Sequence, residues 1–278
     1  MPLKYGVLST GRPRLPDTEP HLLAESENGI ARFTINRPEK RNAMTLAMWQ
    51  HMGDIFEAWA NDQHIRVIVI RGTGDKCFCA GNDISEFAKR RSTPKQIAHY
   101  NTITAKTYSA LHTIPKPTIA RIEGSCMGGG LEVALLCDIQ IASEAATFGV
   151  PPAKLGLGYK LDDTALLVDN IGAKAAKELL LTGRQFPASD ALRWGLVNRV
   201  VPADQLDTVI KDYAEEIAAN APLSVKAGKL IANEAAKPKQ DRDEELCQTL
   251  VDACNRSEDI VEGRQAFSEK RPPKFKGR

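Results

Sequence analysis

A glutamate follows three consecutive glycines near the middle of the chain, and together they could carry out acid-base chemistry. Gly128, Gly129 and Gly130 are followed by Leu131 and Glu132. Glycines let a ligand approach the backbone closely, and free N–H groups at a helix start can bind a negative oxygen. Glu132 would then lie within the first turn of that helix, close to the bound anion. The alternative is a tight turn packed under a sheet, which glycine clusters mark more often than catalysis.

A second glycine-rich loop, 72–83, offers another place where the backbone could meet a ligand. It has glycines at positions 72, 74 and 81 and contains the segment CFCAGND. The preceding residues, 65–71, form a nearly continuous β-branched run, which is typical of a strand covered on both faces. Two such loops in one chain favour a ligand site over two unrelated turns.

The segments around these loops alternate between strands and helices. An apolar run at 117–122 leads into the triple glycine, and a helix-capable segment at 131–137 leads out of it. Residues 21–35 predict a hairpin around Asn28-Gly29, and Thr45 and Thr93 each begin a predicted helix. From residue 162 onward the pattern is mostly helical. We therefore predict an α/β fold with a flexible extension at 1–20, a core at 21–200 and a helical C-terminal region at 201–278.

The composition is that of an ordinary globular protein. Of the 278 residues, 42% are hydrophobic and 26% are charged, and the net charge of +2 gives no indication of a nucleic-acid partner. No apolar run approaches the roughly 20 residues that a membrane span needs. The six cysteines lack the density of a disulfide scaffold, which indicates reduced thiols and a cytoplasmic location. Five scattered histidines give no pattern of metal ligands, so no metal is expected.

Five segments, in order along the chain, resemble the crotonase family, the enoyl-CoA hydratase/isomerase superfamily. They are NRPEKRNAM (36–44), CFCAGNDISEF (77–87), IEGSCMGGGLEVALLCDIQIA (122–142), LTGRQFPASDALRWGLVNRVV (181–201) and EGRQAFSEKRPPKF (262–275). The resemblance implies a spiral of ββα units with an α-helical C-terminal trimerisation region, assembled as a homotrimer or a dimer of trimers. It also implies an acyl-CoA substrate. CoA is then part of the substrate, and no separate cofactor is expected.

The resemblance implies that two backbone N–H groups, those of Ala80 and Gly129, bind the thioester oxygen. Hydration, isomerisation and decarboxylation of acyl-CoAs all develop negative charge on this oxygen, and each preorganised donor contributes about 3 kcal/mol in such sites. Glu132 falls on the first of two catalytic glutamates of the hydratases, where a raised pKa suits proton transfer. A first-turn glutamate that only favours the helix dipole is the alternative.

The second catalytic glutamate of the hydratase pattern is absent. Where that pattern has Phe-Gly-X-Pro-Glu, the chain ends the motif in Pro152, which cannot exchange a proton. Two glycines further along are replaced by Asp162 and Asp163, and one of them, with Asp162 as the first candidate, could supply the lost carboxylate. Helix capping is the favoured alternative for these aspartates. Tyr159 resembles a tyrosine of decarboxylating members that contacts the substrate's carboxylate, and simple packing at the pocket edge is its alternative.

For CoA itself, the resemblance implies a groove lined by residues from the first two motifs: Arg41, Ala43, Ala80, Asp83 and Ile84. Phe267 and Lys270 match C-terminal residues that, in the family, reach the CoA of a neighbouring subunit. A lysine there would supply a positive charge to a phosphate.

The leading hypothesis is an acyl-CoA lyase of the enoyl-CoA hydratase type, with Glu132 as the acid and base. Pro152 and Tyr159 leave open a decarboxylase for a methylmalonyl-type CoA, or an enoyl-CoA isomerase. The missing glutamate also leaves open a third class, a CoA-binding protein that has lost catalysis.

Overall fold

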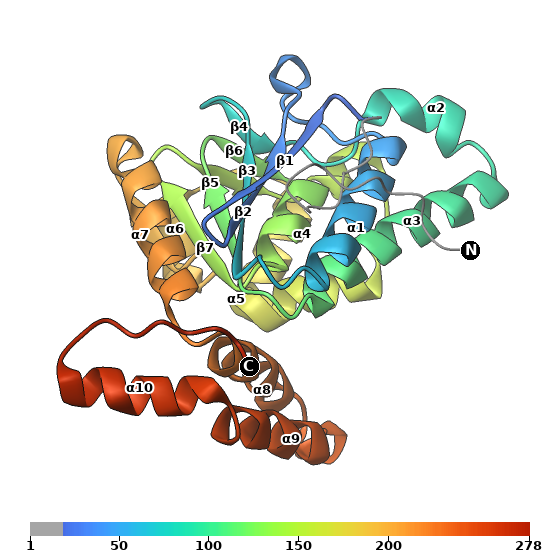
Figure 1. Cartoon of the computed structure of the whole chain (residues 1–278). Coiled ribbons are helices and arrows are strands. Elements are labelled where there is room, and N and C mark those ends of the chain that lie inside the picture. The colour runs from blue at the N-terminus through green and yellow to red at the C-terminus, as the bar shows by residue number, and fades with distance from the viewer. Residues whose placement is uncertain (1–18) are drawn as a thin grey trace.

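Two β-sheets form the centre of the structure, a computed structural model that describes residues 19–278 (Figure 1). The first sheet has six strands in the order β1 (Leu22–Glu27), β2 (Ile30–Ile35), β3 (Val67–Gly72), β5 (Thr118–Ile122), β7 (Ile139–Ser143) and β10 (Arg199–Val201). The second has four short strands in the order β4 (Cys77–Cys79), β6 (Ser125–Met127), β8 (Thr147–Gly149) and β9 (Phe186–Pro187). Only β1 with β2 and β8 with β9 pair antiparallel in these two sheets.

The chain passes from one sheet to the other in repeated steps. β3 leads to β4, β5 to β6 and β7 to β8, and helices follow each of these pairs before the chain returns to the first sheet. This is the spiral of ββα units that the family resemblance implied. The second sheet itself was missed, because strands of two or three residues are too short to show a periodic pattern.

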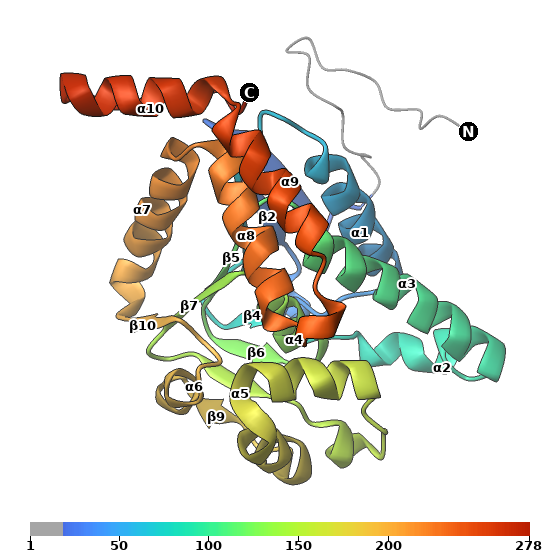
Figure 2. The ribbon, with the colours of Figure 1, turned by 90° about the horizontal axis from the view of Figure 1, so that it is seen from below.

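The described part of the chain has ten α-helices, and Figures 1 and 2 show most of them packed around the sheets. They are α1 (Leu46–Ala60), α2 (Phe87–Arg90), α3 (Pro94–Thr113), α4 (Gly129–Leu135), α5 (Leu161–Thr182), α6 (Ala188–Trp194), α7 (Leu206–Ala219), α8 (Pro222–Ala236), α9 (Glu244–Asn255) and α10 (Glu258–Glu269). α5 contains a break at Gly172, whose φ of 73° is not helical. None of the helices described is both long and apolar enough to cross a membrane.

The local signals read from the sequence correspond to real turns and caps. Asn28 and Gly29 both have positive φ, as a two-residue hairpin turn requires. The Thr45 side chain accepts a hydrogen bond from the Met48 N–H and begins α1. Thr93 and Gln96 form a reciprocal capping box at the start of α3.

The helical C-terminal region divides into two parts. Leu206, Ile210 and Ala214 of α7 pack on the first sheet, against Val67 and Val69 of β3 among others. α7 thus covers the core although it lies beyond residue 200, the predicted end of that core. α8 to α10 form an arm that extends away from the sheets (Figure 1). The predicted extension at 1–20 lies almost wholly outside the described residues.

The triple glycine forms a sharp turn between β6 and α4. Gly128 has φ 51° and ψ −124°, and α4 begins at Gly129, two residues earlier than predicted. A Cβ atom on Gly130 would lie 2.3 Å from the Cys79 carbonyl oxygen. Only glycine therefore lets α4 pack directly against β4.

Replacing Gly130 by alanine is expected to destabilise the fold by about 1–3 kcal/mol, because the new methyl group would overlap the Cys79 carbonyl. Gly228→Ala in α8 is the control, since its added Cβ would meet no atom of the described chain within 4 Å. The control should leave stability unchanged or raise it by up to about 1 kcal/mol. Urea unfolding followed by circular dichroism measures both variants. Equal changes in the free energy of unfolding would contradict the packing described.

Candidate active site

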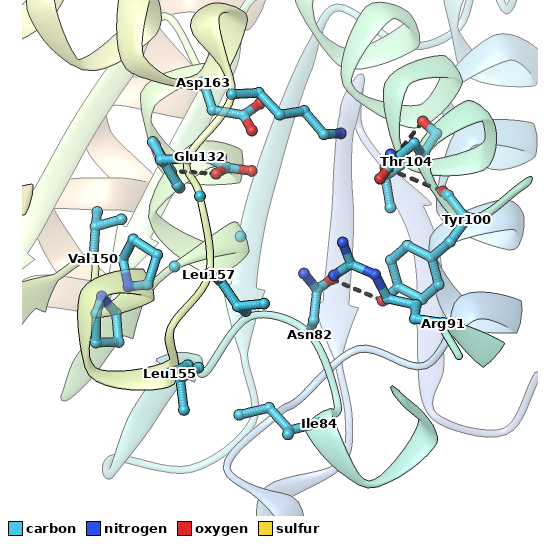
Figure 3. Close-up of a pocket in the computed structure, with 18 of the residues that line it drawn as sticks. Asn82, Ile84, Arg91, Tyr100, Thr104, Glu132, Val150, Leu155, Leu157 and Asp163 are labelled. Atoms are coloured by element: carbon cyan, nitrogen blue, oxygen red, sulfur yellow. Dashed lines mark hydrogen bonds between the residues drawn. The ribbon is translucent and has the colours of Figure 1, made fainter. Parts of the chain in front are cut away.

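Three loops meet where three neighbouring parallel strands end. Cys79 of β4 lies beside Cys126 of β6, and Met127 of β6 lies beside Gly149 of β8. Because the carboxyl ends of these strands lie at one edge, residues 80–82, 128–129 and 150–152 come together there. A cavity of about 340 Å³ opens at this edge and is also lined by residues of α2, α3 and the start of α5 (Figure 3).

The backbone donors at this edge are those of Asn82 and Gly129. The Gly129 N–H is in the first turn of α4, where no intrahelical acceptor exists, and a Cβ on Gly81 would lie 2.9 Å from the Gly129 nitrogen. The two loops are therefore in direct contact. Within residues 19–278, neither the Asn82 N–H nor the Gly129 N–H meets a hydrogen-bond acceptor.

The assignment of Ala80 as an oxyanion donor is wrong for this chain. Ala80 does line the cavity, but its N–H donates to the Arg41 carbonyl over 3.1 Å. That hydrogen bond ties the loop after β4 to the segment before α1 and leaves the N–H unavailable to a ligand. Asn82, two residues later, supplies the free donor instead.

Asn82 is held firmly on both its backbone and its side chain. Met44 forms two backbone hydrogen bonds of 2.8 Å around it, one to the Gly81 carbonyl and one from the Asp83 N–H. The Trp49 indole and the Tyr100 hydroxyl both donate to the Asn82 Oδ1, at 2.8 Å and 2.9 Å. The position of the Asn82 N–H is thus fixed before any ligand binds, which is what makes such donors effective.

Glu132 projects from α4 and is only 6% exposed. The Tyr159 hydroxyl donates a hydrogen bond to its carboxylate, and Tyr108 is a second tyrosine that interacts with it. Burial first, and then the negative charge of Asp163, raise the pKa of Glu132, while the tyrosine hydrogen bonds and the Lys160 charge oppose the rise. A carboxyl group in such a setting can hold and release a proton closer to neutral pH.

A second carboxyl group reaches Glu132 from α5, and it is Asp163 rather than Asp162. Figure 3 shows Asp163 and Glu132 pointing into the same cavity. Burial raises the pKa of Asp163, and the positive charge of Lys160 opposes this rise. Asp162 borders the cavity but is exposed. Neither aspartate is the N-cap residue of α5, contrary to the capping alternative. Lys160 occupies that position, and its side chain forms no capping hydrogen bond.

The predicted CoA-contacting residues divide into two groups. Ala80 and Ile84 line the cavity, whereas Arg41, Ala43 and Asp83 do not. The Asp83 carboxylate instead pairs with Arg37 at 2.7 Å and accepts a hydrogen bond from Ser85. Phe267 and Lys270 lie at the end of α10, far from α2 and α3 in both views of the ribbon (Figures 1 and 2). Their contact with a neighbouring subunit's CoA stays a prediction.

Sequence reasoning missed Asn82, Tyr108 and Arg91 as cavity residues. One signal could have found part of this set, since Tyr100, Thr104 and Tyr108 follow one another every four residues along one face of α3 and all line the cavity. Pro152 also borders the cavity, without a carboxylate. Within residues 19–278, no group of three or more histidine, cysteine, aspartate or glutamate side chains is placed to hold a metal ion.

Comparison with known proteins places the chain in one family. The family model described as enoyl-CoA hydratase/isomerase matches residues 25–278. The chain is 37% identical to the (E)-benzylidenesuccinyl-CoA hydratase of Thauera aromatica, with 91% of the chain and 98% of that protein covered. It is 34% identical to the short-chain-enoyl-CoA hydratase of Clostridium acetobutylicum, with 90% and 95% covered.

Solved structures agree with this placement. A crystal structure of an enoyl-CoA hydratase/carnithine racemase from Magnetospirillum magneticum superposes with a TM-score of 0.87 and is 36% identical, covering 94% of this chain and 97% of that one. The chain therefore belongs to the enoyl-CoA hydratase/isomerase family and has the crotonase-like fold.

Replacing Glu132 by glutamine is expected to stabilise the fold increasingly as pH rises above 4.5, the ordinary glutamate pKa. In the wild type the folded state holds the Glu132 proton more tightly than the unfolded state. Stability is therefore lost as pH rises from 4.5 through the raised pKa of the folded state, by about 1.4 kcal/mol for each pH unit that separates the two pKa values. Glutamine cannot ionise and loses nothing.

Denaturant unfolding of both proteins at several pH values measures this difference. A stability difference that stays constant with pH would show that the pKa of Glu132 is not raised by folding.

Proposed function

We propose that this chain is an acyl-CoA lyase of the enoyl-CoA hydratase type, adding water to the 2,3 double bond of an enoyl thioester. The observation that carries the proposal is the pair of carboxyl groups, Glu132 and Asp163, that faces the cavity bordered by the Asn82 and Gly129 N–H groups. The relatives named as enoyl-CoA hydratases support it. Within the pair, Asp163 supplies the carboxylate that Pro152 cannot.

In the proposed reaction, one carboxyl group takes a proton from water and the other gives a proton to the substrate. The thioester oxygen accepts hydrogen bonds from the Asn82 and Gly129 N–H groups, and water lies between the two carboxyl groups. The ionised carboxyl takes a proton from water as the water oxygen bonds to C3, and charge moves onto the thioester oxygen. The protonated carboxyl then gives its proton to C2. Two close carboxyl groups favour this state, because they do not readily ionise together.

The alternative functions use the same thioester site but need different side chains around it. An isomerase needs one acid-base group to move a proton, so the second carboxyl group favours hydration. A decarboxylase that uses Tyr159 to contact the substrate is less well supported, because the Tyr159 hydroxyl already donates to Glu132. A CoA-binding protein without activity would have no need of a buried carboxyl group with a raised pKa.

The proposal requires no metal or organic cofactor of the protein's own, since the chain supplies both the acid-base groups and the N–H donors. We further propose a homotrimer or a dimer of trimers, in which the exposed Phe267 of the C-terminal arm contacts a neighbouring subunit. A cytoplasmic location is proposed because all six cysteines are free thiols.

Replacing Asp163 by asparagine is expected to lower kcat for hydration by about 100-fold or more, the usual contribution of a positioned acid or base. Asp162→Asn is the matched control and should lower kcat by less than about tenfold, because the Asp162 side chain is exposed. The assay follows the loss of the conjugated enoyl thioester absorbance with short and medium 2-enoyl-CoAs.

Similar losses in the two variants would contradict the role of Asp163. Release of carbon dioxide from methylmalonyl-CoA, with no hydration of any enoyl-CoA, would replace the proposal by the decarboxylase alternative.

A further inference from the structure

The cavity contains a guanidinium group that the mechanism does not use. Arg91 follows α2 directly, is half-buried and lines the cavity. Its guanidinium carbon lies 4.7 Å from the centre of the Phe87 ring and 4.9 Å from that of Tyr100. No carboxylate in residues 19–278 forms an ion pair with it. The Arg91 guanidinium is therefore stacked on two rings at the wall of the cavity, and its positive charge has no carboxylate partner.

Glu132 and Asp163 lie on one side of the cavity together with Lys160, whose positive charge partly offsets theirs, and Arg91 lies on the other side. Figure 3 shows the Arg91 guanidinium beside the Asn82 amide, and Glu132 and Asp163 on the other side. Arg91 has no such carboxylate beside it, whereas the Lys160 charge is already offset by Glu132 and Asp163, so an anionic ligand group is attracted mainly to Arg91. Asn82 adds a donor there, because its Oδ1 already accepts two hydrogen bonds and its Nδ2 has no acceptor within the described chain.

We propose that the acyl chain of the substrate ends in a second anionic group, a carboxylate, which the Arg91 guanidinium binds with help from the Asn82 amide. The inference rests on the proposed function, since it names the class of enoyl-CoA that the same site accepts. A planar guanidinium matches a carboxylate through two parallel hydrogen bonds, and stacking on Phe87 and Tyr100 holds the group in place beforehand.

A CoA phosphate is the other possible anion, and its position makes it the weaker choice. Arg91 lies beside Asn82, whose backbone N–H binds the thioester oxygen in the proposed reaction. The phosphates of CoA are separated from the thioester by the whole pantetheine arm, whereas the end of a short acyl chain is only a few bonds away. The same contact also argues against loss of that carboxylate as carbon dioxide, because the ion pair stabilises the carboxylate in the bound substrate.

The test compares matched 2-enoyl-CoAs that end either in a methyl group or in a carboxylate, over several chain lengths. The wild type should have the higher kcat/KM for the carboxylate-ended member. Arg91→Met should lower the ratio of the two kcat/KM values by about 10- to 100-fold, the size expected for a charge-assisted hydrogen-bonded pair. Arg90→Met is the control and should keep the wild-type ratio, because Arg90 is exposed and outside the cavity.

Calorimetric binding of the corresponding saturated thioesters, and of CoA alone, provides a readout that does not need turnover. If no enoyl-CoA is hydrated, the proposed function fails, and a loss of the binding preference in Arg91→Met would still support the inference. An unchanged preference in that variant would overturn it and leave Arg91 as a stacked surface residue. Equal weakening of both thioesters and of CoA would overturn it in favour of a phosphate contact.

Discussion

The contact between Gly130 and the Cys79 carbonyl determines the geometry of the whole site. With no side chain between them, α4 packs directly on β4, and the turn at Gly128 is placed against the loop at Gly81. The N–H groups of Asn82 and Gly129, which come from different units of the spiral, thereby border one cavity. Glu132 follows three residues after Gly129 on the same helix. A single close backbone contact thus positions both the proposed anion site and the proposed acid-base group Glu132.

The same close packing buries the Glu132 carboxylate and so makes its ionised form costly. A carboxylate as buried as that of Glu132 is costly unless it is neutralised or hydrogen-bonded. Tyr159 provides a hydrogen bond, but burial and the negative charge of Asp163 outweigh it and raise the pKa of Glu132. The protein thereby gives up some stability at neutral pH for a carboxyl group that can exchange protons. Arg91, on the opposite wall, adds a positive charge that forms no ion pair with a carboxylate of the described chain.

Much of the fold was predictable because its signals are local. Thr45 and Thr93 cap helices through their own side chains, and Asn28-Gly29 makes a turn that few other residue pairs favour. The resemblance of the glycine motif and of Glu132 to a known family extended this to the spiral. The site was less predictable, because it depends on which backbone N–H groups are left without an acceptor and on which way each helix turns its side chains. Which N–H is free after β4 depends on the hydrogen bond from Ala80 to Arg41, which residue types do not reveal.

The same limit applies to the second carboxyl group. Neighbouring residues on a helix point about 100° apart, so the choice between Asp162 and Asp163 depends on the residue at which α5 begins. That residue is Leu161, and no capping side chain marks it in the sequence. Arg91 was missed for a related reason, since it follows a four-residue helix that is too short for the sequence pattern to indicate its direction.

The central claim is that Asn82 and Gly129 supply the two donors to the thioester oxygen. A crystal structure with a saturated acyl-CoA bound tests it most directly. We predict that the thioester oxygen lies about 2.7–3.1 Å from both backbone nitrogens, with the Ala80 N–H still bonded to Arg41. A thioester oxygen bound at the Ala80 nitrogen, or outside the cavity that contains Glu132, would contradict it.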